Sequence, residues 1–139
     1  MSTYLAAVVA VGNFVKAGYT SLPVYIDPTE APTPADVATG FVELTWHPGK
    51  KGPLGGRFGN ATYYFVPGTF TLSIFIPRAR GTGPAWAALD ALEALLLEAV
   101  IGDMYIDTCT PVMRELQETD THVQLDVIFS YDLEAFKPT

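Results

Sequence analysis

Two segments of this chain alternate between apolar and polar residues, and they constrain its fold more than any other feature. In residues 69–76 the even positions hold Phe, Leu and Ile, while positions 69, 71 and 73 hold Thr or Ser. In residues 122–131 every odd position, from Val123 to Tyr131, is apolar. A period of two is typical of a β-strand with one buried face. The chain must therefore build a sheet of which one face is covered by other elements.

The remaining segments supply the helices and further strands of an α+β fold. Ser2 or Thr3 can cap a helix that runs to about Ala17. Pro84 can open a second helix over about Ala85–Ile101, with these residues on one apolar face: Trp86, Leu89, Leu92, Leu96 and Val100. Other expected features are strands at 24–26, 41–46, 62–66 and 104–106, a turn at Pro67-Gly68, and an extended proline-rich stretch over 21–40. The prediction is one domain, residues 1–139, with a mostly antiparallel twisted sheet, two helices packed on it and a long β-hairpin or loop arm.

The predicted arm lies between Trp46 and Ala61. Its fourteen residues include five glycines, two prolines and three of the eight basic residues of the chain. Most connections in compact domains are about four to six residues long, so a longer one indicates a role. A phosphate-binding loop needs a Lys-Ser/Thr pair after its last glycine and a helix behind it, whereas Gly49-Lys50-Lys51-Gly52 leads towards a strand. We therefore interpret the arm as a contact to a neighbouring subunit, with a disordered hairpin tip as the alternative.

Composition and charge also favour assembly. Apolar residues make up 49% of the chain and charged residues 17%, below the roughly 25% charged of ordinary soluble domains. The net charge of −7 argues against a dedicated nucleic-acid binder. Residues 1–89 hold six cations and four acids, whereas residues 90–139 hold two cations and eleven acids. One half can attract the other half of a second copy, or the two halves can neutralise each other within one subunit.

The sequence offers little for catalysis or metal binding. The chain has one cysteine, Cys109, and two histidines, His47 and His122, and no known local motif surrounds a Cys109–His122 pair. We expect His122 to face solvent beside Val123 in its strand. No cluster has the spacing of metal ligands, so no catalytic residue, cofactor site or metal site is predicted. A single cysteine and the lack of a long apolar helix indicate a soluble protein without disulfides, outside the membrane.

The order of these elements resembles the tail terminator proteins of long-tailed bacteriophages, the minor tail protein U-like family. The resemblance is carried by the apolar first helix, the Pro23-Val24-Tyr25 segment, the Phe41–Leu44 strand and the basic hairpin. The segment from Pro67 to Pro77, the Ala/Leu-rich helix from Trp86 and the alternating last strand complete it. The resemblance covers roughly Leu5 to Phe136. It lies in the spacing and residue character of the segments rather than in catalytic motifs.

The resemblance implies a structural virion protein of the phage tail or neck, assembled in the host cytoplasm. Such proteins form a homohexameric ring that caps the tail tube, stops its polymerisation and joins it to the head–tail connector protein. The implied partners are further copies of the chain, the tail tube protein and the connector, while genomic DNA passes through the lumen without specific binding. The alternatives are another ring of the neck or tail (a head–tail connector or the tube protein) and a small binding module. As the inter-subunit arm we assign these residues: Lys50, Lys51, Arg57, Phe58, Arg78 and Arg80.

Overall fold

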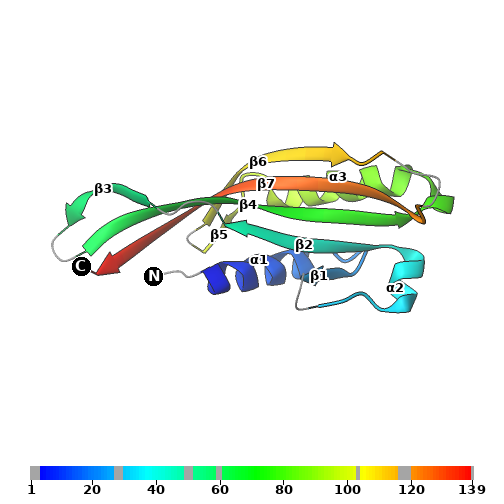
Figure 1. Ribbon diagram of the computed structural model, residues 1–139, viewed down its shortest axis with the longest axis horizontal. Coiled ribbons are helices and arrows are strands. Elements are labelled where there is room, and N and C mark those ends of the chain that lie inside the picture. The colour runs from blue at the N-terminus through cyan, green and yellow to red at the C-terminus, as the bar shows by residue number, and fades with distance from the viewer. Residues whose placement is uncertain are drawn as a thin grey trace.

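A computed structural model describes residues 4–26, 30–48, 52–58, 61–102, 104–115 and 120–138. It confirms the α+β fold, with one seven-stranded sheet in which the strands follow the order β1-β2-β4-β7-β6-β5 and β3 pairs with β4 beside that path (Figure 1). β1 pairs with β2 in parallel, and the other strand pairs are antiparallel. The strands are β1 (Val24–Ile26), β2 (Phe41–Pro48), β3 (Gly52–Phe58), β4 (Ala61–Pro77), β5 (Val100–Ile101), β6 (Met104–Met113) and β7 (His122–Pro138).

The two alternating segments form the centre of this sheet. β4 and β7 are each 17 residues long and pair along their whole length, from Ala61 opposite Pro138 to Pro77 opposite His122. The predicted alternation is confirmed, because one face of both strands is buried and the other is partly exposed. The fully buried apolar residues of the two strands are Phe70, Leu72, Ile74, Ile76, Val123, Leu125, Val127, Phe129 and Tyr131.

The turn predicted at Pro67-Gly68 is wrong, because β4 continues straight through both residues. Proline cannot donate a hydrogen bond to a β-ladder. Along β4, Phe65 is the last residue paired with β3, and Gly68 is the first residue paired with β2. Pro67 thus lies between the two partners on that side of β4, where no ladder requires its missing N–H, while pairing with β7 continues on the other side.

Two helices cover one face of the sheet, as predicted (Figure 1). α1 (Tyr4–Gly18) contacts β1, β2 and β5, and α3 (Gly83–Leu96) contacts β4, β6 and β7. The helices also contact each other, since a Cβ built on Gly18 would lie 2.6 Å from a methyl group of Leu95. Their buried side chains join those of the sheet in one core, and burying each large apolar side chain contributes about 1.5–3 kcal/mol.

The predicted length of the second helix is wrong at its C-terminal end. α3 ends at Leu96 rather than near Ile101, because Glu98 adopts a φ of 65° and turns the chain out of the helix. The Glu98 N–H then donates to the Ile106 carbonyl (2.9 Å), and the Ile106 N–H donates to the Ala99 carbonyl (3.0 Å). Residues 100 and 101 form β5, which pairs with β6 at the edge of the sheet.

A short helix also interrupts the stretch that was expected to be extended. α2 (Pro34–Thr39) begins after Thr33, whose hydroxyl accepts a hydrogen bond from the Asp36 N–H (3.2 Å). Pro34 at the first helical position supports this start, because its fixed φ suits a helix. A 3-10 turn, η1 (Arg78–Arg80), follows β4. Both elements lie at the end of the sheet opposite to β3 (Figure 1).

Candidate assembly surfaces

The predicted arm is a three-stranded extension of the sheet. β3 pairs with the first residues of β4, from Gly52 opposite Phe65 to Phe58 opposite Ala61. The last residues of β7 pair along the other side of β4, up to Pro138 opposite Ala61. Figure 1 shows that these three strands project past α1, together with the C-terminal end of the chain. The sequence predicted an arm between Trp46 and Ala61 but not the strand β3 within it. It also did not predict the third strand, because β7 was expected to end near Tyr131.

The predicted arm residues separate into two groups. Arg57 and Phe58 lie in β3, opposite Thr62 and Ala61, whereas Lys50 and Lys51 lie outside the described residues. Arg78 and Arg80 lie in η1, beyond the other end of β4. A strand of 17 residues spans about 55 Å at about 3.3 Å per residue. The structure therefore does not bring the two arginines of η1 together with β3.

Arg80 has a partner within its own subunit. Its guanidinium Nη1 donates a hydrogen bond to the Thr39 carbonyl (2.8 Å), at the last residue of α2. A cation at this position also interacts favourably with the negative end of the helix dipole. This contact gives Arg80 an intramolecular role at the far end of the sheet.

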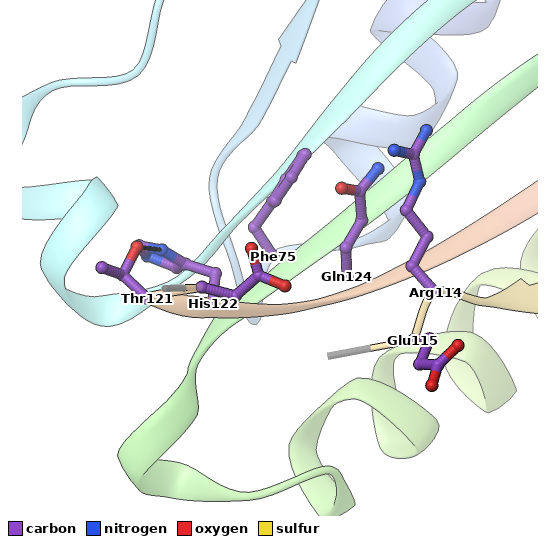
Figure 2. Close-up of a pocket in the computed structure, with 7 residues that line it drawn as sticks. Phe75, Arg114, Glu115, Thr121, His122 and Gln124 are labelled. Atoms are coloured by element: carbon purple, nitrogen blue, oxygen red, sulfur yellow. Dashed lines mark hydrogen bonds between the residues drawn. The ribbon is translucent and has the colours of Figure 1, made fainter. Parts of the chain in front are cut away.

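A shallow pocket of about 470 Å³ lies at that end, where residues of β4, β6 and β7 meet (Figure 2). His122 lies in its wall, with Nε2 2.6 Å from the Val37 carbonyl and Nδ1 2.8 Å from the Thr121 hydroxyl. Because a carbonyl can only accept, Nε2 is the donor to α2. His122 was expected to face solvent, but it is half-buried against α2 and Phe41. The pocket is lined by Phe75, Arg114, Glu115, Asp120, Thr121, His122 and Gln124.

Two of the polar side chains that line the pocket bind the carboxylate of Asp126. The Arg114 Nε lies 3.3 Å from the Asp126 Oδ2, and the Gln124 amide donates to the Asp126 Oδ1 (2.9 Å). Figure 2 shows Gln124, which lies in β7, beside Arg114, which directly follows β6. These contacts hold the polar face of β6 and β7 together.

Cys109 and His122 do not form a pair. Cys109 lies in β6 opposite Phe129 and packs against the core, on the helix-covered face. His122 lies on the opposite face, opposite Pro77. Burial raises the pKa of the Cys109 thiol, and the nearby Glu93 carboxylate raises it further, so the thiolate needed for nucleophilic chemistry is disfavoured. Within the described ranges, no three His, Cys, Asp or Glu side chains gather as metal ligands would.

Sequence reasoning missed an exposed apolar surface at the end of α3 and on the edge strands. Trp86 and Val100 were expected on the buried face of the helix, but Trp86 is 44% exposed and Val100 is 68% exposed. Val100 belongs to β5, where it pairs with Tyr105, which is 42% exposed. Leu97, the residue after α3, is also exposed. This surface was missed because Leu96 and Val100 have helical spacing. Val100 was therefore expected on the same apolar helix face as Leu96.

Among the described residues, no helix has both the length and the apolar character to cross a membrane.

No family model matches the sequence, and no curated protein matches it. Solved structures do share its fold. One is a protein whose name states no function; it is 18% identical, with a TM-score of 0.62, over 97% of this chain and 94% of its own. Another is a chain of the virion of a native gene transfer agent (GTA) particle, 18% identical, with a TM-score of 0.60, over 96% of this chain and 100% of its own. At this identity the likeness shows the fold, which extends over the full length of both chains.

Proposed function

We propose that this chain is a non-enzymatic structural protein of a phage-type virion, whose copies form a hexameric ring on the end of the tail tube. The ring stops polymerisation of the tube protein and joins the tube to the head–tail connector. The observation that carries this proposal is the fold shared, end to end, with a chain of a gene transfer agent virion. That protein assembles into a particle, and an equivalent role accounts for the surfaces described above.

The exposed surfaces are those of a subunit that is covered by other chains. Large apolar side chains are exposed on α1, α3, β5 and β6, and contiguous exposed apolar surface on a soluble protein marks interaction sites. The three-stranded arm projects from the body of the molecule (Figure 1), which gives it the reach to contact a neighbouring subunit. Both features suit a ring better than an isolated monomer.

The charge of the chain suits a channel through which DNA passes. The net charge is −7 at pH 7. Affinity for nucleic acid depends mainly on neutralising phosphates with Lys and Arg. An acidic ring therefore lets the duplex move through its lumen without binding it specifically.

The test is the assembly state of the purified protein, first alone and then with its tail tube protein. Light scattering after size-exclusion chromatography and negative-stain images should show closed rings of six copies. Added during tube polymerisation, the protein should fix the length of the tubes and appear as a cap at one end.

Each other result points to a different assignment. Open-ended stacks formed by the protein alone would identify it as the tube subunit, because a stacking contact does not close. Rings that leave tube ends growing would identify another ring of the neck. A protein that stays monomeric at all concentrations, with tubes present, would contradict the ring.

A further inference from the structure

Three exposed apolar residues lie in or just before the strands at the β5 edge of the sheet, and we name them the β5 edge patch: Leu97, Val100 and Tyr105. Val100 is 68% exposed and pairs with Tyr105, which is 42% exposed. The backbone beneath them is fixed, because residues 98 and 99 are hydrogen-bonded to Ile106 of β6. The patch is thus apolar and held in place by the ladder, as an interface surface is expected to be.

The segment of sequence that contains the patch is acidic. Between Arg80 and Arg114 the chain contains no Lys or Arg, but it contains five acids: Asp90, Glu93, Glu98, Asp103 and Asp107. Glu98 follows Leu97, and Asp107 lies two residues after Tyr105; both are exposed. A partner that covers this patch must therefore be apolar at its centre and basic around it.

The arm of the same chain has these properties. The hairpin from Gly49 to Phe58 contains three cations and no acid. The paired segments of β4 and β7 in the arm contain aromatic residues, with Tyr63 opposite Phe136 and Tyr64 opposite Ala135 along the ladder. The arm extends past α1 (Figure 1). Its sequence thus combines aromatic residues with a basic hairpin, a composition complementary to that of the β5 edge patch and the acids beside it.

The topology separates these two surfaces within one subunit. β3 pairs with β4 on the side that β2 also occupies, whereas β5 ends the sheet on the far side of β7 and β6. A contact between β3 of one copy and β5 of another therefore uses two different surfaces of each copy. Such a contact is heterologous, and it repeats from copy to copy until a ring closes.

We propose that the arm of each subunit lies on the β5 edge patch of the next subunit, with Arg57 beside Glu98 and Asp107. This inference rests on the proposed ring and names the contact that closes it. The basic hairpin of one copy would thus bind an apolar patch with acidic residues beside it on a second copy of the same chain.

Disulfide trapping tests the contact directly. The native thiol is removed by Cys109→Ser, and Arg57→Cys is combined with Val100→Cys. Mild oxidation should link each copy to the next and give a ladder of covalent oligomers up to the full ring on non-reducing gels. The control combines Arg57→Cys with Val112→Cys, at an exposed position further along β6, and should give no ladder.

The outcomes separate this contact from the proposed function. Equal ladders from both pairs, no ladder from either, or a reaction that stops at dimers would overturn the contact. A protein that caps tubes but gives no ladder disproves the contact alone. A full ladder from rings that leave tubes growing supports the contact and disproves the capping role.

A second variant tests the same contact without new cysteines. Val100→Lys places a cation in the patch and should raise the subunit concentration needed for ring formation by about tenfold or more. Val112→Lys makes the same exchange on β6, opposite Asp126, and should leave assembly unchanged. Circular dichroism confirms that both variants fold. Equal assembly of the two variants would contradict the proposal.

Discussion

Gly40 links α2 to β2 in a conformation that other residues rarely adopt. Its φ is 120°, and a Cβ built on it would lie 3.1 Å from the Phe75 carbonyl oxygen. That neighbour is backbone of the central strand β4, which cannot move aside without disturbing the sheet. Glycine is required here by conformation and by space together.

The substitution Gly40→Ala should therefore destabilise the protein. We expect it to lower the free energy of unfolding by about 1–3 kcal/mol, the usual cost of a strained backbone position. Gly83→Ala is the matched control, because a Cβ there meets nothing within 4 Å and Gly83 begins α3. Urea denaturation followed by circular dichroism measures both. Equal stability of the two variants would show that Gly40 is not constrained in this way.

Cys109 provides a prediction of chemical reactivity. Burial, and then the carboxylate of Glu93, raise the pKa of its thiol. Only the thiolate attacks disulfide reagents, so labelling by dithionitrobenzoate at pH 8 should be slower in the folded protein than in urea. Glu93→Gln removes the neighbouring charge, lowers the pKa and should speed labelling of the folded protein by a few fold. Glu98→Gln should leave the rate unchanged, and a rate insensitive to both variants would exclude the Glu93 effect.

At the scale of elements, α2 differs from the other helices in how it is held. None of its residues is buried. Side chains from three other elements bind it instead. The Tyr25 hydroxyl donates to the Asp36 carboxylate, His122 donates to the Val37 carbonyl, and Arg80 donates to the Thr39 carbonyl. Polar contacts of this kind contribute about 0.5–1.5 kcal/mol each, so α2 can open without unfolding of the core.

Removing one of these contacts should loosen α2 alone. Arg80→Ala is expected to speed hydrogen exchange of the α2 amides by about tenfold, equivalent to about 1.4 kcal/mol. The exchange of β4 and β7 should not change, because their protection depends on the core. Arg114→Ala removes another exposed arginine, whose partner is Asp126, and serves as the control. Faster exchange throughout the sheet would contradict a local role.

The elements that the sequence could predict are those in which periodicity and burial agree. The alternation of β4 and β7 follows directly from the one-sided core. The arm between Trp46 and Ala61 follows from its glycines and its length, although the strand β3 within it was not predicted. α2 was missed because its prolines suggested extended backbone, although Thr33 and Pro34 together are a helix start. β5 was missed because Leu96 and Val100 have helical spacing, and the positive φ of Glu98 leaves no pattern in the sequence.

The assembly surfaces could also be predicted only where they depend on local sequence. The basic hairpin is visible in the sequence because its composition is local. The distance between the basic hairpin and Arg78 and Arg80 depends on the length of β4. This length was underestimated from the sequence, because a turn was expected at Pro67-Gly68. The β5 edge patch depends on where α3 ends, and this is a tertiary feature.

At the scale of the whole molecule, the distribution of charge follows the positions of the strands in the sheet. It does not follow the division of the sequence into residues 1–89 and 90–139. β7 belongs to the acidic half, yet it lies between β4 and β6 in the middle of the sheet. The segment without cations, from Gly81 to Met113, contains α3 on one face of the sheet and β5 and β6 at one edge. The basic hairpin lies on the other side of β4. The basic hairpin and the segment without cations thus lie on different sides of the central strands, as the proposed head-to-tail contact between copies needs.

Assembly should therefore depend on salt and on the sign of the hairpin. The Debye length falls from about 14 Å at 0.05 M salt to about 4 Å at 0.5 M, so the ring should dissociate more readily as salt rises. Reversing three charges, by Lys50→Glu, Lys51→Glu and Arg57→Glu, should weaken assembly at low salt and remove most of its salt dependence. The free energy of unfolding of the subunit should stay the same, because the arm lies outside the core.

Charge exchange between copies provides the control. The reversed hairpin should regain assembly when Glu98→Lys and Asp107→Lys are added to the same chain, because the attraction is restored with opposite signs. Asp90→Lys, on the exposed face of α3, adds positive charge away from the β5 edge patch and should restore less. Sedimentation velocity at two salt concentrations measures each variant. If Asp90→Lys restores assembly as well as the patch variants do, the attraction is one of net charge and the hairpin has no specific target.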